Sequence, residues 1–370
     1  MQDDIPYLLL TPGPLTTTKT VKQAMLVDLS TWDRDYNDIV QEVRHALVKF
    51  ATQTDEYTCV LMQGSGSFSV EATIGTVIPP TGKLLIVTNG AYGERICAMA
   101  ERLRIPSAVL RCQETEVPDA DRLRRMLKED PAISHVAIVH CETTTGILNP
   151  IAGLIPVAKE FDCEVILDAM SSFGGVPLSV DKLGVDYLVS SANKCIQGVP
   201  GFGFVIARRD RLEKTKGYAR SLSLDLFDQW STMEAHRGKW RYTSPTHVLL
   251  AFRQAIEELN EEGGVLSRYQ RYHDCQRRLV AEMREIGFQT LLDDPWHSPI
   301  ITSFIYPHES WFDFDRLYEL LKQRRFVVYP GKVTEHDTFR IGTIGDLNTD
   351  DIQALAVAMR ESIAELKRIA

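Results

Sequence analysis

The chain has 370 residues, of which 44% are apolar and 25% are charged, and its formal net charge at pH 7 is −9. These proportions are ordinary for a globular protein and exclude a disordered or fibrous chain. The acidic balance argues against a protein whose main task is to bind nucleic acid or an anionic membrane, because such proteins usually carry a basic excess. A local cationic pocket for a small anion is still compatible with it.

The localisation signals point to the cytoplasm. No apolar stretch approaches the roughly 20 residues that a membrane-spanning helix needs, and the acidic start of the chain does not resemble a signal peptide. The seven cysteines are scattered and odd in number, which indicates reduced thiols. Neither they nor the nine histidines form the close pairs typical of zinc ligands, so we expect no metal site.

Short apolar runs rich in Val, Ile and Leu alternate with helical patterns over the first half of the chain. Because most runs are continuous in apolarity, they indicate strands that are covered by helices on both faces, as in a parallel sheet. The expected strands are 58–62, 83–88, 107–111, 135–141, 164–167, 187–190 and 202–207. The expected helices between them are 67–77, 92–104, 119–129 and 151–161. This alternation predicts a doubly wound α/β layer.

The pattern changes in the second half of the chain. Segment 221–245 is polar and aromatic at once, which favours a loop-like contact surface. The elements expected after it are helices 246–262 and 266–286, strand 299–306, helix 313–324, strands 326–329 and 338–342, and helix 350–368. They predict a smaller α+β domain. We expect a large domain over 1–255, with an N-terminal arm over 1–20, and a small domain over 256–370.

A Gly/Ser-rich segment, 64–67, follows the expected strand 58–62 and opens a helix. Such a loop offers free backbone N–H groups and the positive end of a helix to an anion. A tight turn with serine as the helix cap accounts for the same residues equally well. The segment is not a Walker A loop, and Ser69 stands where a dinucleotide-binding motif needs its third glycine. It therefore suggests a phosphate without suggesting ATP or NAD.

Asp168 and Lys194 also follow expected strands. Taken alone, Asp168 fits a turn cap as well as a ligand-binding carboxylate, and a lysine is most often exposed. Together with the phosphate loop they match the three handles of pyridoxal phosphate, namely its phosphate, its pyridine nitrogen and its aldehyde. Desolvation would lower the pKa of such a lysine and make its neutral amine a nucleophile.

Longer motifs carry a family resemblance. They are TPGP at 11–14, LMQGSGS at 61–67, ETTTG at 142–146, DAMSSFGG at 168–175, SSANKCIQGVPG at 190–201, LLDD at 291–294 and YPGK at 329–332. On these residues the chain resembles the class V aminotransferases of the fold-type I pyridoxal-phosphate group, nearly end to end. The resemblance implies an α/β fold, with a large domain built on a mostly parallel seven-stranded sheet and a smaller C-terminal α+β domain.

The resemblance also implies roles for individual residues. Lys194 would bind the cofactor covalently and act as base and acid, and Asp168 would pair with the pyridine nitrogen. Either Thr144 or Thr145 would reach the ring oxygen of the cofactor, and the sequence does not decide between them. Arg340 would clamp the substrate carboxylate, although an isolated arginine is more often on the surface, and Gly13 could close over the same end. The other implied cofactor-binding residues are Ser65, Gly66, Ser67, Tyr92, Ser191 and Thr243.

Segment 190–201 is most similar to family members that transfer the amino group of 2-aminoethylphosphonate to pyruvate, giving phosphonoacetaldehyde and L-alanine in phosphonate catabolism. This implies a homodimer with shared sites, in which Thr243 serves the other subunit. Arg340, Arg241 and Lys332 are candidates for the phosphonate contacts.

Three alternatives remain. An alanine–glyoxylate or serine–pyruvate aminotransferase would use the same scaffold. A cysteine desulfurase would need a reactive cysteine late in the chain, where Cys275 falls in a helical stretch. A binding protein without catalysis would have no need of both Lys194 and Asp168.

Overall fold

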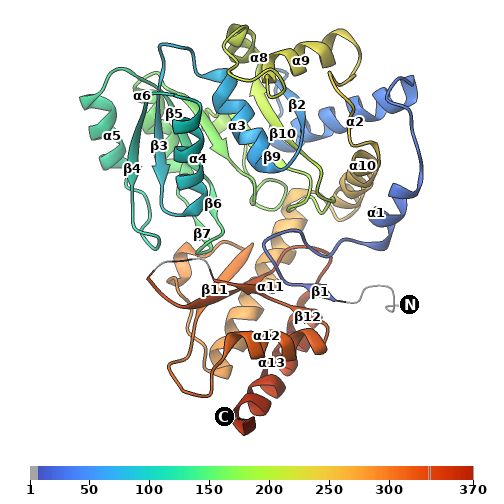
Figure 1. Cartoon of the computed structure of the whole chain (residues 1–370), viewed down its shortest axis with the longest axis vertical. Coiled ribbons are helices and arrows are strands. Elements are labelled where there is room, and N and C mark those ends of the chain that lie inside the picture. The colour runs from blue at the N-terminus through green and yellow to red at the C-terminus, as the bar shows by residue number, and fades with distance from the viewer. Residues whose placement is uncertain (1–6, 332, 334, 370) are drawn as a thin grey trace.

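The structure is a computed structural model that describes residues 7–331, 333 and 335–369. A seven-stranded sheet forms the centre of its first part (Figure 1), in the order β2-β10-β9-β8-β5-β3-β4. The strands are β2 (Tyr57–Gln63), β3 (Lys83–Thr88), β4 (Ser107–Arg111), β5 (Ile133–Val139), β8 (Glu164–Asp168), β9 (Tyr187–Ser191) and β10 (Phe202–Arg208). β10 pairs antiparallel with both neighbours, and the other pairs are parallel. The predicted mostly parallel sheet is confirmed.

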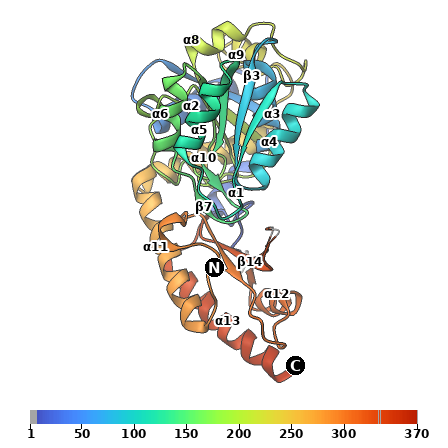
Figure 2. The same ribbon diagram turned by 90° about the vertical axis from the view of Figure 1, so that its left-hand side faces the viewer.

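Helices cover both faces of this sheet, as the apolar strands require. The four predicted helices are α3 (Gly66–Val77), α4 (Ala91–Arg102), α5 (Ala120–Glu129) and α6 (Ile151–Glu160). Figure 2 shows α3 and α4 on one side of β3, and α5 and α6 on the other. Because both faces of the sheet are buried, its strands need no alternation of polar and apolar residues.

Two helices in the first part depart from the sequence-based prediction. No helix is predicted over α2 (Arg34–Ala51), although Tyr36, Val40, Val43 and Leu47 recur at helical spacing and are all buried. The expected loop 221–245 is wrong in part, because it contains α9 (Leu226–Ala235). There the carboxylate of Asp225 accepts the N–H of Asp228 at 2.9 Å and caps the helix. The shorter helices of this part are α1 (Lys19–Gln23), α7 (Val180–Leu183) and α8 (Arg209–Leu212).

The second part lies below the first in Figure 1. α10 (Thr246–Glu261) still packs with the first part. The elements of the second part are α11 (Val265–Ile286), β11 (Ile301–Ile305), α12 (Phe314–Gln323), β12 (Phe326–Val327), β13 (Tyr329–Pro330), β14 (Thr338–Gly342) and α13 (Thr349–Ile369). β14 is the middle strand of an antiparallel sheet, β11-β14-β13. The expected strand 326–329 is divided, since β12 pairs instead with the N-terminal strand β1 (Leu8–Leu9).

Apolar side chains form two large cores. One extends from Val21 to Leu259 along the chain, and the other combines Leu10 with residues between Cys275 and Leu366. Residue 255 falls inside α10, so the expected domain boundary there stays a prediction. Among the described helices, none has the length and apolarity needed to cross a membrane.

The topology brings the predicted site residues to one edge of the large sheet. β8 and β9 run parallel and end at Asp168 and Ser191. β2 and β9 both pair antiparallel with β10, so β2 runs in the same direction as β9. Gln63, the last residue of β2, therefore lies at the same edge of the sheet. The carboxyl ends of parallel strands are where open α/β sheets bind ligands. In Figure 1 this edge faces the second part of the molecule.

Candidate active site

Lys194 lies just beyond β9, under the N-terminal arm. Its Nζ donates a hydrogen bond to the carbonyl oxygen of Pro12 at 2.7 Å. Burial lowers the pKa of the Lys194 amine to about 8. Gly13 has φ +117°, and a Cβ added to it would lie 2.7 Å from the same Nζ, so glycine is required at this approach. The arm thus closes over the lysine from one side.

Asp168 ends β8 and is buried. Its Oδ1 accepts the N–H of Met170 at 2.9 Å. Burial raises the pKa of the Asp168 carboxyl to about 6, and the Met170 hydrogen bond opposes that shift. A buried acid of this kind is stabilised as a carboxylate by a cationic partner, which a protonated pyridine nitrogen would supply.

The Gly/Ser loop begins α3. Ser65 occupies the N-cap position, yet its side chain makes no capping hydrogen bond, so a serine cap does not account for its hydroxyl. The Oγ of Ser67 accepts from Arg95 at 3.0 Å. A Cβ on Gly66 would collide with the side chain of Met170. The loop therefore leaves N–H groups, a hydroxyl and a guanidinium at a helix N-terminus, which suits a phosphate.

One small cavity connects the loop with Asp168. Its lining includes Ser67, Tyr92, Arg95, Asp168 and Met170. Tyr92 stands in the first turn of α4, where the guanidinium of Arg95 lies 4.9 Å from the centre of its ring. An aromatic ring, a carboxyl group and the start of α3 thus line one space, and their roles toward a cofactor stay predictions.

The two threonine candidates are both fully buried but differ in their contacts. The hydroxyl of Thr144 donates to Oε1 of Glu142 at 2.6 Å. The hydroxyl of Thr145 donates to the backbone oxygen of Glu142 at 3.4 Å and accepts from Ile147 N at 3.3 Å. The choice between them for the cofactor ring stays a prediction.

Ser191 and Thr243 have contrasting environments. The Oγ of Ser191 is buried at the end of β9, and no described atom forms a hydrogen bond with it. Such an orphaned hydroxyl near Lys194 is what a bound polar group would satisfy. Thr243 is instead exposed on the surface of this chain.

Arg340 is brought to the site from the other part of the molecule. It stands in the middle of β14 and is 3% exposed, which excludes a surface arginine. Its Nη1 donates to the backbone oxygen of Thr143 at 2.8 Å, and its Nε to that of Pro330 at 3.0 Å. The ring of Tyr329 lies 5.3 Å from the guanidinium carbon. These contacts fix a cation beside the ETTTG segment.

Nothing in the described part of the chain brings Arg241 or Lys332, the other two candidates for phosphonate contacts, to this site. Arg241 is held by the backbone oxygens of Leu222 and Asp225, at 3.0 and 3.4 Å, so it stabilises the start of α9. Lys332 lies outside the described residues.

Two buried polar residues of this region were not predicted from the sequence. Nδ1 of His140 lies 2.8 Å from the hydroxyl of Ser172, and burial lowers the pKa of His140 to about 4, so the imidazole is neutral. Glu142 is fully buried beside Tyr92 and Thr144. The one sequence feature that could have indicated a role for Glu142 is its position as the first residue of the ETTTG motif.

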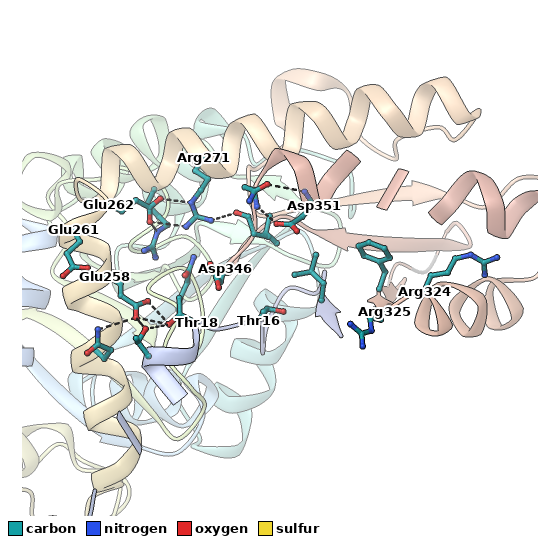
Figure 3. A pocket seen from close by; sticks show the side chains of 18 residues that line it. Thr16, Thr18, Glu258, Glu261, Glu262, Arg271, Arg324, Arg325, Asp346 and Asp351 are labelled. Carbon is teal, nitrogen blue, oxygen red and sulfur yellow. Dashed lines mark hydrogen bonds and ion pairs between the residues drawn. The ribbon is translucent and has the colours of Figure 1, made fainter. Parts of the chain in front are cut away.

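A separate cavity of about 980 Å³ lies between the N-terminal arm, α10, α11 and the segment after β14 (Figure 3). Part of its charged lining is engaged in contacts within the cavity wall. Glu262 binds Arg268 and Arg271, and Glu258 accepts from Thr18 and Thr20. None of the predicted catalytic residues lines it.

The fold and the site together define a class. A buried amine, a buried acid, a phosphate-binding helix start and an orphaned hydroxyl, at one edge of a mostly parallel sheet, fit pyridoxal phosphate in a fold-type I enzyme. The chain belongs to the aminotransferase class-V family, whose model matches residues 21–334.

Comparison with curated proteins and solved structures agrees with this. The chain is 59% identical to a 2-aminoethylphosphonate–pyruvate transaminase of Bacillus cereus, over 96% of this chain and 98% of the relative. A transaminase of the same name from Bacillus mycoides is 58% identical over the same shares. Ureidoglycine–glyoxylate aminotransferase of Bacillus subtilis is similar in structure, with a TM-score of 0.89, 23% identity and coverage of 98% of this chain and 94% of that one.

Proposed function

We propose that this protein transfers the amino group of 2-aminoethylphosphonate to pyruvate, giving phosphonoacetaldehyde and L-alanine in phosphonate catabolism. The observation that carries the proposal is the 59% identity, over 96% of the chain, with transaminases of this name. The conjunction of Lys194, Asp168 and Arg340 supplies the required groups. The alternative, an alanine–glyoxylate or serine–pyruvate aminotransferase, has weaker support, since a solved alanine–glyoxylate aminotransferase from Nostoc is 25% identical.

When bound, pyridoxal phosphate supplies an aldehyde that takes up the amino group and a ring that withdraws electrons from the carbon bearing it. Lys194 would hold the cofactor through its amine, and the same amine, when free, would serve as the base and acid that moves a proton at that carbon. Because burial lowers the pKa of its amine to about 8, a useful fraction is neutral near pH 7. Asp168 keeps a proton on the ring nitrogen through its negative charge.

Anion recognition falls to Arg340 and the α3 loop. Ser65, Gly66 and Ser67 face the cofactor phosphate, with Ser191 and Tyr92 around the rest of the ring. Arg340 meets the pyruvate carboxylate, and a planar guanidinium also suits the oxygens of a phosphonate. Gly13 and the arm exclude water from the same end. Both substrates are anions, so a buried cation serves them in turn within an acidic protein.

We further propose a cytoplasmic homodimer with shared sites. The seven cysteines are free thiols, which suits a reducing compartment. Phe68, Leu222 and Tyr242 are large apolar side chains that are 51%, 76% and 51% exposed. Tyr242 precedes the exposed Thr243 and lines a hollow with Gly64 of the phosphate loop. An apolar surface at this place supports a second subunit that covers it and receives Thr243.

A donor screen with purified protein tests the proposed reaction. Incubation with pyridoxal phosphate, 2-aminoethylphosphonate and pyruvate should produce alanine and an equal amount of phosphonoacetaldehyde, measured by proton and phosphorus NMR. Alanine with glyoxylate, and serine with pyruvate, serve as competing pairs. Rapid turnover of either pair, with none of the phosphonate, would replace the proposal by its alternative.

A further inference from the structure

Glu142 contributes a buried carboxyl group that takes no part in the chemistry proposed for Lys194, Asp168 and Arg340. It is 0% exposed. Its Oε2 accepts the N–H of Tyr92 at 3.1 Å. Its Oε1 accepts both the N–H of Thr144, at 3.2 Å, and the hydroxyl of Thr144, at 2.6 Å. Both oxygens are therefore used, and each serves a different segment of the chain.

These contacts join two segments that are 50 residues apart in sequence. One is the first turn of α4, which carries Tyr92. The other is the turn between β6 (Cys141–Glu142) and β7 (Ile147–Leu148), which carries Thr144. The fit is close, since a Cβ on Gly90, the residue before α4, would lie 2.5 Å from the carboxyl carbon of Glu142. The absence of a side chain on Gly90 thus leaves the room that the Glu142 side chain fills.

The surroundings give the carboxyl group an electrostatic effect on the site. Burial raises the pKa of Glu142, whereas its hydrogen bonds with Thr144 and Tyr92 lower it. Burial raises the pKa of Asp168, and the charge of Glu142 adds to that shift; burial lowers the pKa of Arg340, and the charge of Glu142 opposes that shift. The ionisable groups that face it are Tyr92 on α4, Asp168 at the end of β8, Arg340 on β14 and Cys141 on its own strand.

We propose that Glu142 is a positioning residue for the cofactor, because it holds the backbone of the helix turn that carries Tyr92 and orients the hydroxyl of Thr144. The inference rests on the proposed function, because the ring and the hydroxyl face a ligand only if pyridoxal phosphate binds here. A hydroxyl that donates its hydrogen to Glu142 presents lone pairs on its other side. Glu142 thus holds the Thr144 hydroxyl in one orientation with lone pairs left for a bound group, whereas the hydroxyl of Thr145 is bonded to backbone atoms on both sides.

The test is a set of variants measured by cofactor binding and not by turnover. Glu142→Gln keeps the shape, but its amide has a single acceptor oxygen, so its NH₂ must face the backbone N–H of either Tyr92 or Thr144, and one of the two links is lost. We expect the dissociation constant of pyridoxal phosphate to rise roughly tenfold or more. We also expect the pH midpoint of the bound cofactor's absorption spectrum to shift, because the Thr144 hydroxyl or the helix turn that carries Tyr92 is then no longer held in place.

A double-mutant cycle locates the effect. If Glu142 acts through Thr144, adding Thr144→Val to Glu142→Gln weakens cofactor binding by much less than Thr144→Val does alone. Thr145→Val, made in both backgrounds, should have the same effect in each. Equal effects of Thr144→Val in both backgrounds would show that the two residues act independently and would overturn the proposal.

Asp186→Asn is the matched control for a purely structural loss. Asp186 is also 0% exposed, and it accepts the N–H of Val165 at 2.7 Å and an ion pair from Lys159, at the opposite edge of the sheet. We expect this variant to lower the melting temperature and leave the cofactor spectrum unchanged. The proposal is wrong if Glu142→Gln behaves in the same way, or if it binds cofactor as the wild type does.

Two further outcomes have clear meanings. If Glu142→Gln does not fold, Thr144→Val alone decides, since an unchanged cofactor spectrum in that variant contradicts the orientation of its hydroxyl. If the wild-type protein does not bind pyridoxal phosphate at all, the proposed function fails first, and the inference fails with it.

Discussion

At the scale of single residues, burial disfavours the charged forms of both Lys194 and Asp168. The pKa of Lys194 is lowered to about 8 and that of Asp168 is raised to about 6. A pKa shift of this kind is a free-energy cost of the folded state without ligand. A bound cofactor would remove that cost if, as proposed, its aldehyde takes up the amine and its protonated ring nitrogen pairs with the carboxylate. Affinity for the cofactor and stability without it are therefore opposed at these positions.

Asp168→Asn should show this opposition directly. The amide oxygen can still accept the N–H of Met170, but no charge is buried. In the cofactor-free protein at pH 7 we expect a higher free energy of unfolding, by about 3 kcal/mol at most, because each pKa unit corresponds to about 1.4 kcal/mol. Cofactor affinity should fall. Urea unfolding and cofactor titration measure the two effects.

The pH dependence of that gain follows from the direction of the shift. The folded-state pKa of Asp168, about 6, is above its ordinary value of 3.8, so the folded wild type binds more protons between these limits and loses stability as pH rises through them. The difference between Asp168→Asn and wild type should thus be largest above pH 6 and vanish towards pH 4. A difference independent of pH would show that charge burial is not its cause.

Arg340 permits a second prediction at this scale. Arg340→Ala should lower kcat/KM for pyruvate by roughly 30-fold or more, since losing one partner of a buried charge pair costs about 2 kcal/mol or more. Arg340→Lys keeps the positive charge but not the bidentate geometry of the guanidinium, so its kcat/KM should be only slightly higher than that of Arg340→Ala. Steady-state kinetics with each substrate, together with cofactor titration, measure this. An unchanged KM for pyruvate would place the carboxylate elsewhere.

At the scale of elements, α9 depends on its cap. Asp225 accepts the N–H of Asp228, so Asp225→Ala should lower the free energy of unfolding by about 1 kcal/mol. Asp33 is the matched control, because it occupies the N-cap of α2 without a capping hydrogen bond from its side chain. Asp33→Ala should cost a few tenths of a kcal/mol. Denaturant unfolding measures both, and equal losses would contradict the role of the cap.

The elements also show what the sequence can predict. Strands such as β3 and β10 were found because they are apolar on both faces, and short continuous apolar runs bounded by turn residues are typical of buried strands. α9 was not predicted because Trp230 and Gln229 give its segment the composition of a polar, aromatic contact surface. The burial of the helix depends on residues far away in the sequence. One of them is Leu61, whose backbone oxygen accepts a hydrogen bond from Gln229 at 3.1 Å. Local pattern does not contain that partner.

The same distinction applies to the site. Lys194, Asp168 and the α3 loop were predictable, because each follows a recognisable strand and the strand ends share one edge. The burial of Arg340 was not, since β14 belongs to another sheet and its contact with Thr143 spans 197 residues. The role of Glu142 depends on a contact with the start of α4 that the sequence does not reveal.

At the scale of the whole molecule, the site is assembled from pieces with separate cores. The large sheet contributes Lys194 and Asp168, the small sheet contributes Arg340, and the N-terminal arm contributes Pro12 and Gly13. β1 of the arm pairs with β12, so the arm links the second part to the lysine. Any relative movement of the two parts would change the distance between Arg340 and Lys194, and substrate binding can therefore be coupled to closure.

The proposed homodimer predicts complementation between inactive variants. Lys194→Ala removes the amine, and Thr243→Ala removes the group proposed to reach the partner's site. When the two variants are mixed, unfolded and refolded together, about half of the dimers should be hybrids, and each hybrid has one site with both lesions and one with neither. Cofactor affinity and activity should then recover to roughly a quarter of the wild-type sites. Mixtures without refolding are the control, and no recovery in refolded mixtures that contain dimers would show that each site is built from one chain.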